Sequence, residues 1–418
     1  MSKIEGLITD HCPNGVEYKT LGELGMFYGG LSGKSKEDFS NGNARFITYM
    51  NIYSNISIKT DDTTFVKVSE NENQNKIEYG DVLFTGSSET PDECGMSSVL
   101  TKLVDEPLYL NSFCFGFRFN DKNLILPEFS KYLFRDNQMR DQIAKTASGV
   151  TRFNVSKKRF AKINIPLPPL AVQEEIVKIL NSFTELEAEL EAELEARKKQ
   201  YNYYRSKLLT FNDEENKRIR EVTLGDIGIM IRGNGLQKKD FTESGVGCIH
   251  YGQIYTYYGT FTDKTKSFVS PELAKKLKKV QKGDVIITNT SENLEDVGKA
   301  VVWCGEDEIV TGGHATVFRP KMVTGKYFAY YTQTPMFFDQ KRKFAKGTKV
   351  IDVSATDMCK ITIPVPTFNE QDRIVSILDK FNALVNDISV GLPAELNVRR
   401  QQYEYYRNKL LTFKEYAK

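Results

Sequence analysis

The sequence predicts an α+β protein with a pseudo-two-fold internal repeat, in which two similar globular domains are separated by two long helices. One observation is a segment that occurs twice, at Ile163–Phe211 and Ile361–Phe413, each time with an early Pro-x-Pro and a final Leu-Leu-Thr-Phe. A second is a looser repeat in the residues before each copy. A third is a stripe of apolar residues at steps of three and four within each copy, which is typical of a coiled-coil helix.

The two copies of the helical segment align residue by residue. Gln173 matches Gln371 and Phe183 matches Phe381, both 198 positions apart, whereas Tyr201 matches Tyr403 at a separation of 202 positions. The second copy is therefore four residues longer than the first, and four residues make about one helical turn.

The composition excludes several classes of protein. A chain of 418 residues suggests two or more domains, and a net charge of +2 excludes a polycation that coats nucleic acid. Six scattered cysteines and only three histidines predict no zinc site, and we expect reduced, mostly buried thiols. Because the first residues lack an apolar signal core and no segment approaches a membrane span, we expect a cytoplasmic protein.

The segments that precede each helical copy also correspond to one another. Gly80–Glu89 matches Gly283–Glu292, and Ala147–Ser156 matches Ala345–Ser354. Short apolar or β-branched segments between turn residues predict strands, and these lie at Arg45–Met50, Asp81–Thr85, Phe113–Phe119, Asp284–Thr288 and Ala315–Arg319. Helices are expected at Pro127–Ala144 and Lys326–Phe344, which makes each unit a compact α+β domain of ordinary size.

The helical copies predict two long rods that bury each other as an antiparallel coiled coil, although separate bundles remain an alternative. About 40 helical residues make a rod of about 60 Å. Gly391 and Pro393 predict a kink or short break in the second rod, and the alternating glutamates of the first rod predict a solvated face. The expected seam residues are Ile176, Ile179, Phe183, Leu190, Tyr204, Leu208, Ile374, Ile377, Phe381, Ile388, Tyr406 and Leu410.

No catalytic arrangement emerges from the sequence. Gly29–Ser35 resembles a phosphate-binding loop but is one residue short of the required spacing, and the matching stretch of the second unit has no Gly-Lys-Ser. None of the three histidines is echoed at the matching position of the other repeat, which leaves little for acid–base catalysis. A binding protein is therefore favoured over an enzyme, and the sequence predicts no catalytic or metal-binding residues.

Polar, basic and aromatic loops repeat in the two globular units and predict nucleic-acid contacts, because arginine and amide side chains can pair with two atoms of a base edge. Each such residue alone is more often part of a turn or a helix cap, and only the paired occurrence favours binding. The candidates are Lys34, Thr48, Tyr49, Asn51, Ser87, Ser88, Thr151, Arg152, Asn154, Lys157, Lys158, Arg232, Asn234, Lys238, His250, Tyr251, Gln253, Thr290, Ser291, Lys346, Thr348 and Lys349.

The chain resembles the specificity subunits of type I restriction–modification systems. The resemblance rests on the Ile-Pro-Leu-Pro-Pro entry of the helical segment at Ile165–Leu180, its repeat at Ile363–Leu378, and the Tyr-Tyr-Arg-x-Lys-Leu-Leu-Thr-Phe ends. It covers essentially the whole chain in the right order. By this resemblance, residues 1–165 and 213–363 are target recognition domains, and residues 166–212 and 364–418 are the two conserved helical regions.

The resemblance implies a non-catalytic subunit whose two recognition domains each read one half of a bipartite site in double-stranded DNA. The helices would set the spacer and dock two adenine methyltransferase subunits, with restriction endonuclease/translocase subunits joining for cleavage. S-adenosylmethionine, ATP and magnesium would be bound by those partners and none by this chain. The alternative is a coiled-coil scaffold whose globular ends bind protein, and sequence-selective DNA retention separates the two interpretations.

Overall fold

The computed structural model describes residues 6, 10–211, 219–387 and 389–416. The chain divides into two compact units, here called the first and the second unit. The first unit comprises Met1–Glu189 and Asn397–Lys418, and the second comprises Leu190–Leu396. The predicted seam residue Ile388 lies outside the described residues.

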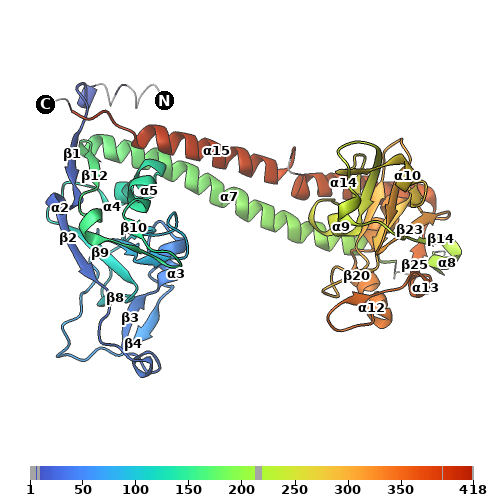
Figure 1. Ribbon diagram of the computed structural model, residues 1–418, viewed down its shortest axis with the longest axis horizontal. Helices are drawn as coiled ribbons and strands as arrows, with labels where there is room; N and C mark the ends of the chain where they lie inside the picture. Colours follow the sequence, from blue (N-terminus) through green and yellow to red (C-terminus); the bar gives the residue numbers. More distant parts are fainter. Residues whose placement is uncertain (1–5, 7–9, 212–218, 388, 417–418) are drawn as a thin grey trace. The chain divides into compact units, whose positions relative to one another are not determined.

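The first unit is built on two sheets (Figure 1). An antiparallel sheet has the order β2-β9-β5-β7, and a three-stranded sheet has the order β4-β3-β8, in which β3 and β8 are parallel. The smaller pairings are β1-β12 and β10-β11-β6. The strands are β1 (Glu17–Thr20), β2 (Gly25–Gly29), β3 (Ala44–Ile47), β4 (Thr64–Val66), β5 (Val82–Thr85), β6 (Ser87–Ser88), β7 (Ser97–Val99), β8 (Leu108–Leu110), β9 (Cys114–Phe119), β10 (Ala147–Ser148), β11 (Phe153–Val155) and β12 (Asn164–Leu167).

The second unit repeats this plan with one more strand in each of its two sheets. Its main sheet has the order β14-β23-β19-β21-β16, and its second sheet has the order β17-β15-β22-β18. The smaller pairings are β13-β25 and β20-β24. The strands are β13 (Arg220–Thr223), β14 (Gly228–Arg232), β15 (Val246–His250), β16 (Phe261–Thr262), β17 (Ser267–Val269), β18 (Lys278–Val280), β19 (Val285–Thr288), β20 (Thr290–Ser291), β21 (Ala300–Trp303), β22 (Ile309–Gly312), β23 (Ala315–Pro320), β24 (Ile351–Asp352) and β25 (Thr362–Val365).

The short helices follow the same order in both units, except that α10 has no counterpart in the first unit. Those of the first unit are α2 (Leu21–Leu24), η1 (Lys36–Phe39), α3 (Tyr49–Ser54), α4 (Pro127–Leu133), α5 (Asn137–Ala144) and α6 (Lys157–Phe160). Those of the second unit are α8 (Leu224–Ile227), η3 (Lys238–Asp240), α9 (Tyr251–Thr256), α10 (Pro271–Ala274), α11 (Gly325–Tyr331), α12 (Pro335–Phe344) and α13 (Ala355–Met358). Strands β12 and β25 cross the domain boundaries expected from the sequence at 165/166 and 363/364.

Two expectations about local structure were wrong. The segment Arg45–Met50 is not one strand, because β3 ends at Ile47 and the Thr48 hydroxyl accepts a hydrogen bond from the Asn51 amide at 3.2 Å, which begins α3. The single helices expected at Pro127–Ala144 and Lys326–Phe344 are each two helices, since an N-cap residue begins a new helix in the middle. Asp136 caps α5, and Thr334 caps α12 just before a proline that has no N–H to donate.

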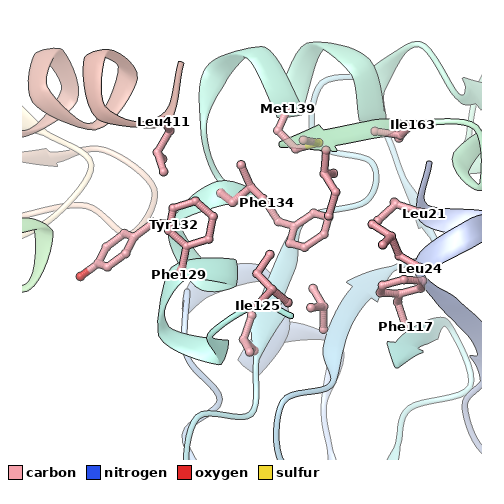
Figure 2. Close-up of a cluster of buried hydrophobic side chains, with 14 of the residues drawn as sticks. Leu21, Leu24, Phe117, Ile125, Phe129, Tyr132, Phe134, Met139, Ile163 and Leu411 are labelled. Atoms are coloured by element: carbon pink, nitrogen blue, oxygen red, sulfur yellow. The ribbon is translucent and has the colours of Figure 1, made fainter. Parts of the chain in front are cut away.

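An aromatic core lies between the main sheet of the first unit and helix α4. Phe117, Phe129 and Phe134 are fully buried there together with Leu21 from α2, and Figure 2 shows these side chains converging. The start of α7 (Leu170–Leu208) joins the same core through Val172, Ile176 and Leu180. The second unit repeats this junction with α14 (Phe368–Asn386), whose Ile374, Val375 and Leu378 pack into its core. Each globular part is thus fused to the helix that follows it in the chain.

The break expected near Gly391–Pro393 is confirmed, because α14 ends at Asn386 and α15 (Leu392–Leu411) begins six residues later. Helices α14 and α15 have 19 and 20 residues, which together match the 39 residues of α7. The four extra residues of the second copy are therefore absorbed by the five residues between the two helices and do not add a helical turn. This corrects the interpretation of the longer copy as one additional turn.

The seam packs antiparallel within each unit. In the first unit the Phe183 ring lies 6.4 Å from the Tyr403 ring and 5.4 Å from the Tyr406 ring. Farther along α7, the Glu187 carboxylate accepts a hydrogen bond from Arg400 at 2.6 Å, so position numbers on α15 fall as those on α7 rise. In the second unit Phe381 of α14 packs against Tyr201 and Tyr204 of α7, at 6.3 Å and 5.7 Å between ring centroids.

Burial agrees with the expected faces of these helices. Glu185, Glu189, Glu191 and Glu195 of α7 are exposed, which agrees with the solvated face predicted for the glutamates of the first rod. Of the described seam residues, Tyr204 is exposed and the others are buried or partly buried, namely Ile176, Ile179, Phe183, Leu190, Leu208, Ile374, Ile377, Phe381, Tyr406 and Leu410. No helix in the described ranges is both long enough and apolar enough to span a membrane.

Candidate nucleic-acid interface

A pocket of about 520 Å³ opens on the first unit and gathers residues from four distant parts of the sequence. Five of the predicted contact residues line it, namely Tyr49, Ser87, Ser88, Thr151 and Arg152. Its other lining residues are Met50, Tyr53, Glu89, Glu93 and Phe113. We call this hollow the Ser87 pocket.

Arg152 enters the Ser87 pocket from the loop between β10 and β11. Its Nε donates to the Ser87 hydroxyl at 3.1 Å, and its guanidinium lies 5.6 Å from the centre of the Phe113 ring, which is 60% exposed. Among the described residues, none accepts a hydrogen bond from its two Nη atoms. An anchored guanidinium with two unengaged donors can bind a base edge or a phosphate through both.

Glu93 lies in the same pocket and was missed by the sequence analysis. Its carboxylate accepts hydrogen bonds from Tyr53 at 2.7 Å, from Ser88 at 3.2 Å and from Thr90 at 3.1 Å. These donors hold the pKa of Glu93 below its usual range, with the Tyr53 hydroxyl as the main cause, and the same bond raises the pKa of Tyr53. A signal was present in the repeat, because Glu93 aligns with Asp296 at the same separation of 203 positions as Glu89 with Glu292.

Buried hydrogen bonds position the backbone around the pocket. The Tyr49 hydroxyl donates to the Ser87 carbonyl at 2.9 Å, and burial raises the pKa of Tyr49. Arg140 from α5 donates to the carbonyls of Asp92 at 2.8 Å and Cys94 at 2.6 Å, directly beside Glu93. Burial lowers the pKa of Arg140 to about 10, and the cation holds the turn that presents Glu93.

The second unit holds the matching turn by a cation from a different position of the helix. Lys341, which aligns with Ile143 and not with Arg140, is 4% exposed and donates to the carbonyls of Glu295 at 2.8 Å and Val297 at 2.5 Å. Burial lowers the pKa of Lys341 to about 8. Tyr255 donates to the Thr290 carbonyl, and burial raises the pKa of Tyr255 to about 12. Both units contain a Tyr-x-x-x-Tyr sequence, but they use different tyrosines. In the first unit the first tyrosine, Tyr49, binds the Ser87 carbonyl, and in the second unit the second tyrosine, Tyr255, binds the equivalent Thr290 carbonyl.

The side chains that face solvent differ between the two units. Val350 occupies the position of Arg152 and is 59% exposed, and His314 occupies the position of Phe113. The Tyr251 ring lies 5.1 Å from the His314 ring. A shared framework therefore carries unequal surfaces, which is the arrangement expected of two readers of different sequences.

Several predicted contact residues have structural roles. Asn51 is 1% exposed and its side-chain amide donates to the carbonyls of Lys59 at 2.8 Å and Asp62 at 2.7 Å. His250 is 5% exposed, and burial is the main cause that lowers its pKa. Its Nδ1 accepts from the Gly252 amide at 3.1 Å, which caps α9. The ammonium of Lys34 donates to the Lys67 carbonyl at 2.6 Å and pairs with Glu72. As placed, these three side chains support loops and do not face a ligand.

The remaining candidates are residues near helix starts, partly buried residues and exposed residues. Thr48 caps α3, and Gln253 of α9 donates to the Ser267 hydroxyl at 2.6 Å. Tyr251, Thr290 and Ser291 are partly buried. The exposed candidates are Asn154, Lys157, Lys158, Arg232, Asn234, Lys238, Lys346, Thr348 and Lys349. Of these, Lys346 pairs with Asp357 at 3.1 Å. The described residues contain no group of three histidine, cysteine or acidic side chains that could hold a metal ion.

Comparison with known proteins gives consistent matches. The model of the family described as type I restriction modification DNA specificity domain matches residues 13–196 and again 216–398. A putative type I restriction enzyme specificity subunit of Haemophilus influenzae is 36% identical over 280 residues, which is 64% of this chain and 68% of that protein. The EcoR124I/EcoR124II specificity subunit of Escherichia coli is 36% identical over 262 residues, which is 60% of this chain and 63% of that protein.

Solved structures share the fold at low sequence identity. One chain, from work on complex assembly and conformational transition of the type I R-M system, aligns with a TM-score of 0.67 at 16% identity and covers 96% of this chain and 98% of its own. The HsdS subunit from Thermoanaerobacter tengcongensis aligns with a TM-score of 0.51 at 17% identity, over 96% of both chains.

Proposed function

Because this chain belongs to the type I restriction modification DNA specificity domain family, we propose that each of its units reads one half of a bipartite site in double-stranded DNA. The chain is a specificity subunit and supplies sequence recognition, whereas the chemistry belongs to other subunits of the restriction–modification complex. The observation that carries the proposal is the pair of equivalent loop frameworks whose exposed side chains differ. Arg152 and Phe113 occupy one set of positions, and Val350 and His314 occupy the other.

The partners follow from the same assignment. We expect the chain to bind two adenine methyltransferase subunits through its long helices and to join restriction endonuclease/translocase subunits for cleavage. S-adenosylmethionine, ATP and magnesium would then be bound by these partners. Exposed tyrosines support a docking role for the helices, because Tyr203 and Tyr405 occupy equivalent positions and are 60% and 62% exposed.

Modified-base sequencing tests the proposal directly. The chain is expressed with its methyltransferase subunits in a host that lacks other adenine methylation, and the genome is compared with that of the same strain without this gene. We expect adenine methylation at one gapped, asymmetric motif only when the chain is present. An unchanged methylation map, with both subunits shown to be expressed, would favour a protein-binding scaffold instead.

The long helices supply a second test, because we propose that they set the spacer between the half-sites. Removing four residues from the middle of α7 and four from the start of α15 shortens each helix by about 6 Å. Since DNA rises about 3.4 Å per base pair, the methylated motif should lose up to about 2 base pairs of spacer. An unchanged spacer in a variant that still methylates would exclude this role of the helices.

A further inference from the structure

Two opposite charges are presented in the Ser87 pocket by adjacent residues of one short strand. The Ser87 hydroxyl accepts from Arg152 Nε at 3.1 Å, and the Ser88 hydroxyl donates to the Glu93 carboxylate at 3.2 Å. Among the described residues, Arg152 and Glu93 form no ion pair with each other. A forked donor and a charged acceptor therefore lie in one pocket with capacity for further hydrogen bonds.

The chemistry of these two groups selects one kind of ligand. A guanidinium fork binds two neighbouring acceptors, and in the major groove only guanine presents such a pair, at N7 and O6. A carboxylate accepts but cannot donate, so it is matched by the exocyclic amino group of cytosine and opposed by the carbonyl oxygens of thymine and guanine. An adenine–thymine pair offers no neighbouring pair of acceptors on one base to the arginine.

Both groups line the same pocket, and each is hydrogen-bonded to one of two adjacent serines. One guanine–cytosine pair presents both matching edges side by side, since guanine O6 and cytosine N4 are joined by a hydrogen bond of about 2.9 Å. From this complementarity we infer that Arg152 and Glu93 together read one guanine–cytosine pair in the half-site bound by the first unit, with guanine on Arg152 and the cytosine amino group on Glu93. The inference rests on the proposed function of the chain as a DNA reader.

The second unit cannot make the same contact. Asp296 aligns with Glu93, but its carboxylate accepts from the Asn293 side chain at 2.8 Å, and Val350 stands in place of Arg152. The neighbouring Lys349 is exposed and has a single ammonium instead of a planar fork. The paired contact of Arg152 and Glu93 therefore has no counterpart at the matching positions of the second unit, and this contributes to the asymmetry of the whole site.

The test uses the methyltransferase complex that contains the full chain. Initial methylation rates are measured on duplexes in which every base pair of both half-sites is replaced in turn. For the unaltered complex we expect one position of one half-site at which replacing guanine–cytosine by adenine–thymine slows methylation about 10- to 100-fold. Arg152→Lys keeps the charge but removes the fork, and Glu93→Gln removes the charge but keeps the shape.

Both variants should lose discrimination at that same position and at no other, and the double variant should lose less than the product of the two single effects, because the groups share one target. Val350→Ala at the matching position of the second unit is the control and should leave that position unchanged. Effects of Arg152→Lys and Glu93→Gln at two different base pairs, or an equal slowing on every duplex, would overturn the assignment. If the unaltered complex methylated no gapped motif, the proposed function itself would fail.

Discussion

Asp284, directly before β19, forms a two-point ion pair with Arg319 of the neighbouring strand β23, with Nε to Oδ1 at 3.0 Å and Nη2 to Oδ2 at 2.7 Å. The Asp284 carboxylate also accepts from the Gln281 amide at 2.9 Å and is almost fully buried. Asp81 and Arg118 repeat the pair in the first unit at 2.8 Å and 2.7 Å. The repeated Gly-Asp-Val sequence is therefore part of the framework and not of the binding surface.

Replacing Asp284 by Ala should destabilise the second unit by about 3 kcal/mol, because it leaves a partly buried guanidinium without its partner. Trp303 is the only tryptophan and lies in this unit, so its fluorescence during urea unfolding reports on the second unit. Glu306→Ala is the control, since Glu306 pairs with Lys282 at the surface and its replacement should leave the free energy of unfolding nearly unchanged. Equal losses for the two variants would contradict the framework role.

Replacing Gln371 by Leu should cost about 2–4 kcal/mol through unsatisfied backbone groups. The buried Gln371 side chain accepts from the Thr324 amide at 2.7 Å and donates to the carbonyls of Met322 at 3.2 Å and Pro366 at 2.9 Å. Gln173 makes the same set of bonds in the first unit. Urea unfolding followed at Trp303 measures the loss, and the exposed Asp372→Ala should remain within about 0.5 kcal/mol of the unaltered chain.

Replacing Gly391 by Ala should destabilise the junction between α14 and α15 by about 1–3 kcal/mol. A β-carbon at this position would lie 2.3 Å from the Ala383 carbonyl oxygen and 2.7 Å from that of Leu384. Gly259→Ala is the matched control in the same unit, because nothing lies within 4 Å of its β-carbon. Thermal unfolding of both variants by circular dichroism and Trp303 fluorescence checks the difference, and an unaffected Gly391→Ala chain would show that the junction can repack.

The buried Lys341 should make the stability of the second unit depend on pH. Its pKa is about 8 in the fold and near 10.5 in the unfolded chain, so between these values the unfolded chain binds more protons. The free energy of unfolding should therefore rise with pH above about 8, by at most about 1.4 kcal/mol per pH unit. Lys341→Met should remove this rise, and urea unfolding at several pH values from 7.5 to about 10 compares the two chains. Identical pH profiles would contradict the contribution of Lys341.

Part of the candidate site could be predicted from the sequence, because the duplication aligns equivalent loops. Arg152, Ser87 and Tyr49 were singled out in this way, and the structure brings them into one pocket. Asn51 and His250 were singled out by the same reasoning but support loops from inside the fold. A polar residue that repeats in a loop has the same signature whether it binds a ligand or the backbone, so sequence alone could not separate the two kinds.

The sequence by itself determined the duplicated α+β architecture, the apolar stripes of the long helices and the break before Pro393, because these depend on periodicity and on local backbone preferences. The tertiary contacts decided that the stripes pack antiparallel and not in separate bundles. Only the tertiary structure decided which side chains share a pocket. Glu93 reaches Tyr53 and Ser88 through a turn whose carbonyls are held by Arg140, 45 to 48 positions away. Such contacts depend on packing between segments distant in the chain, for which no local pattern of residues exists.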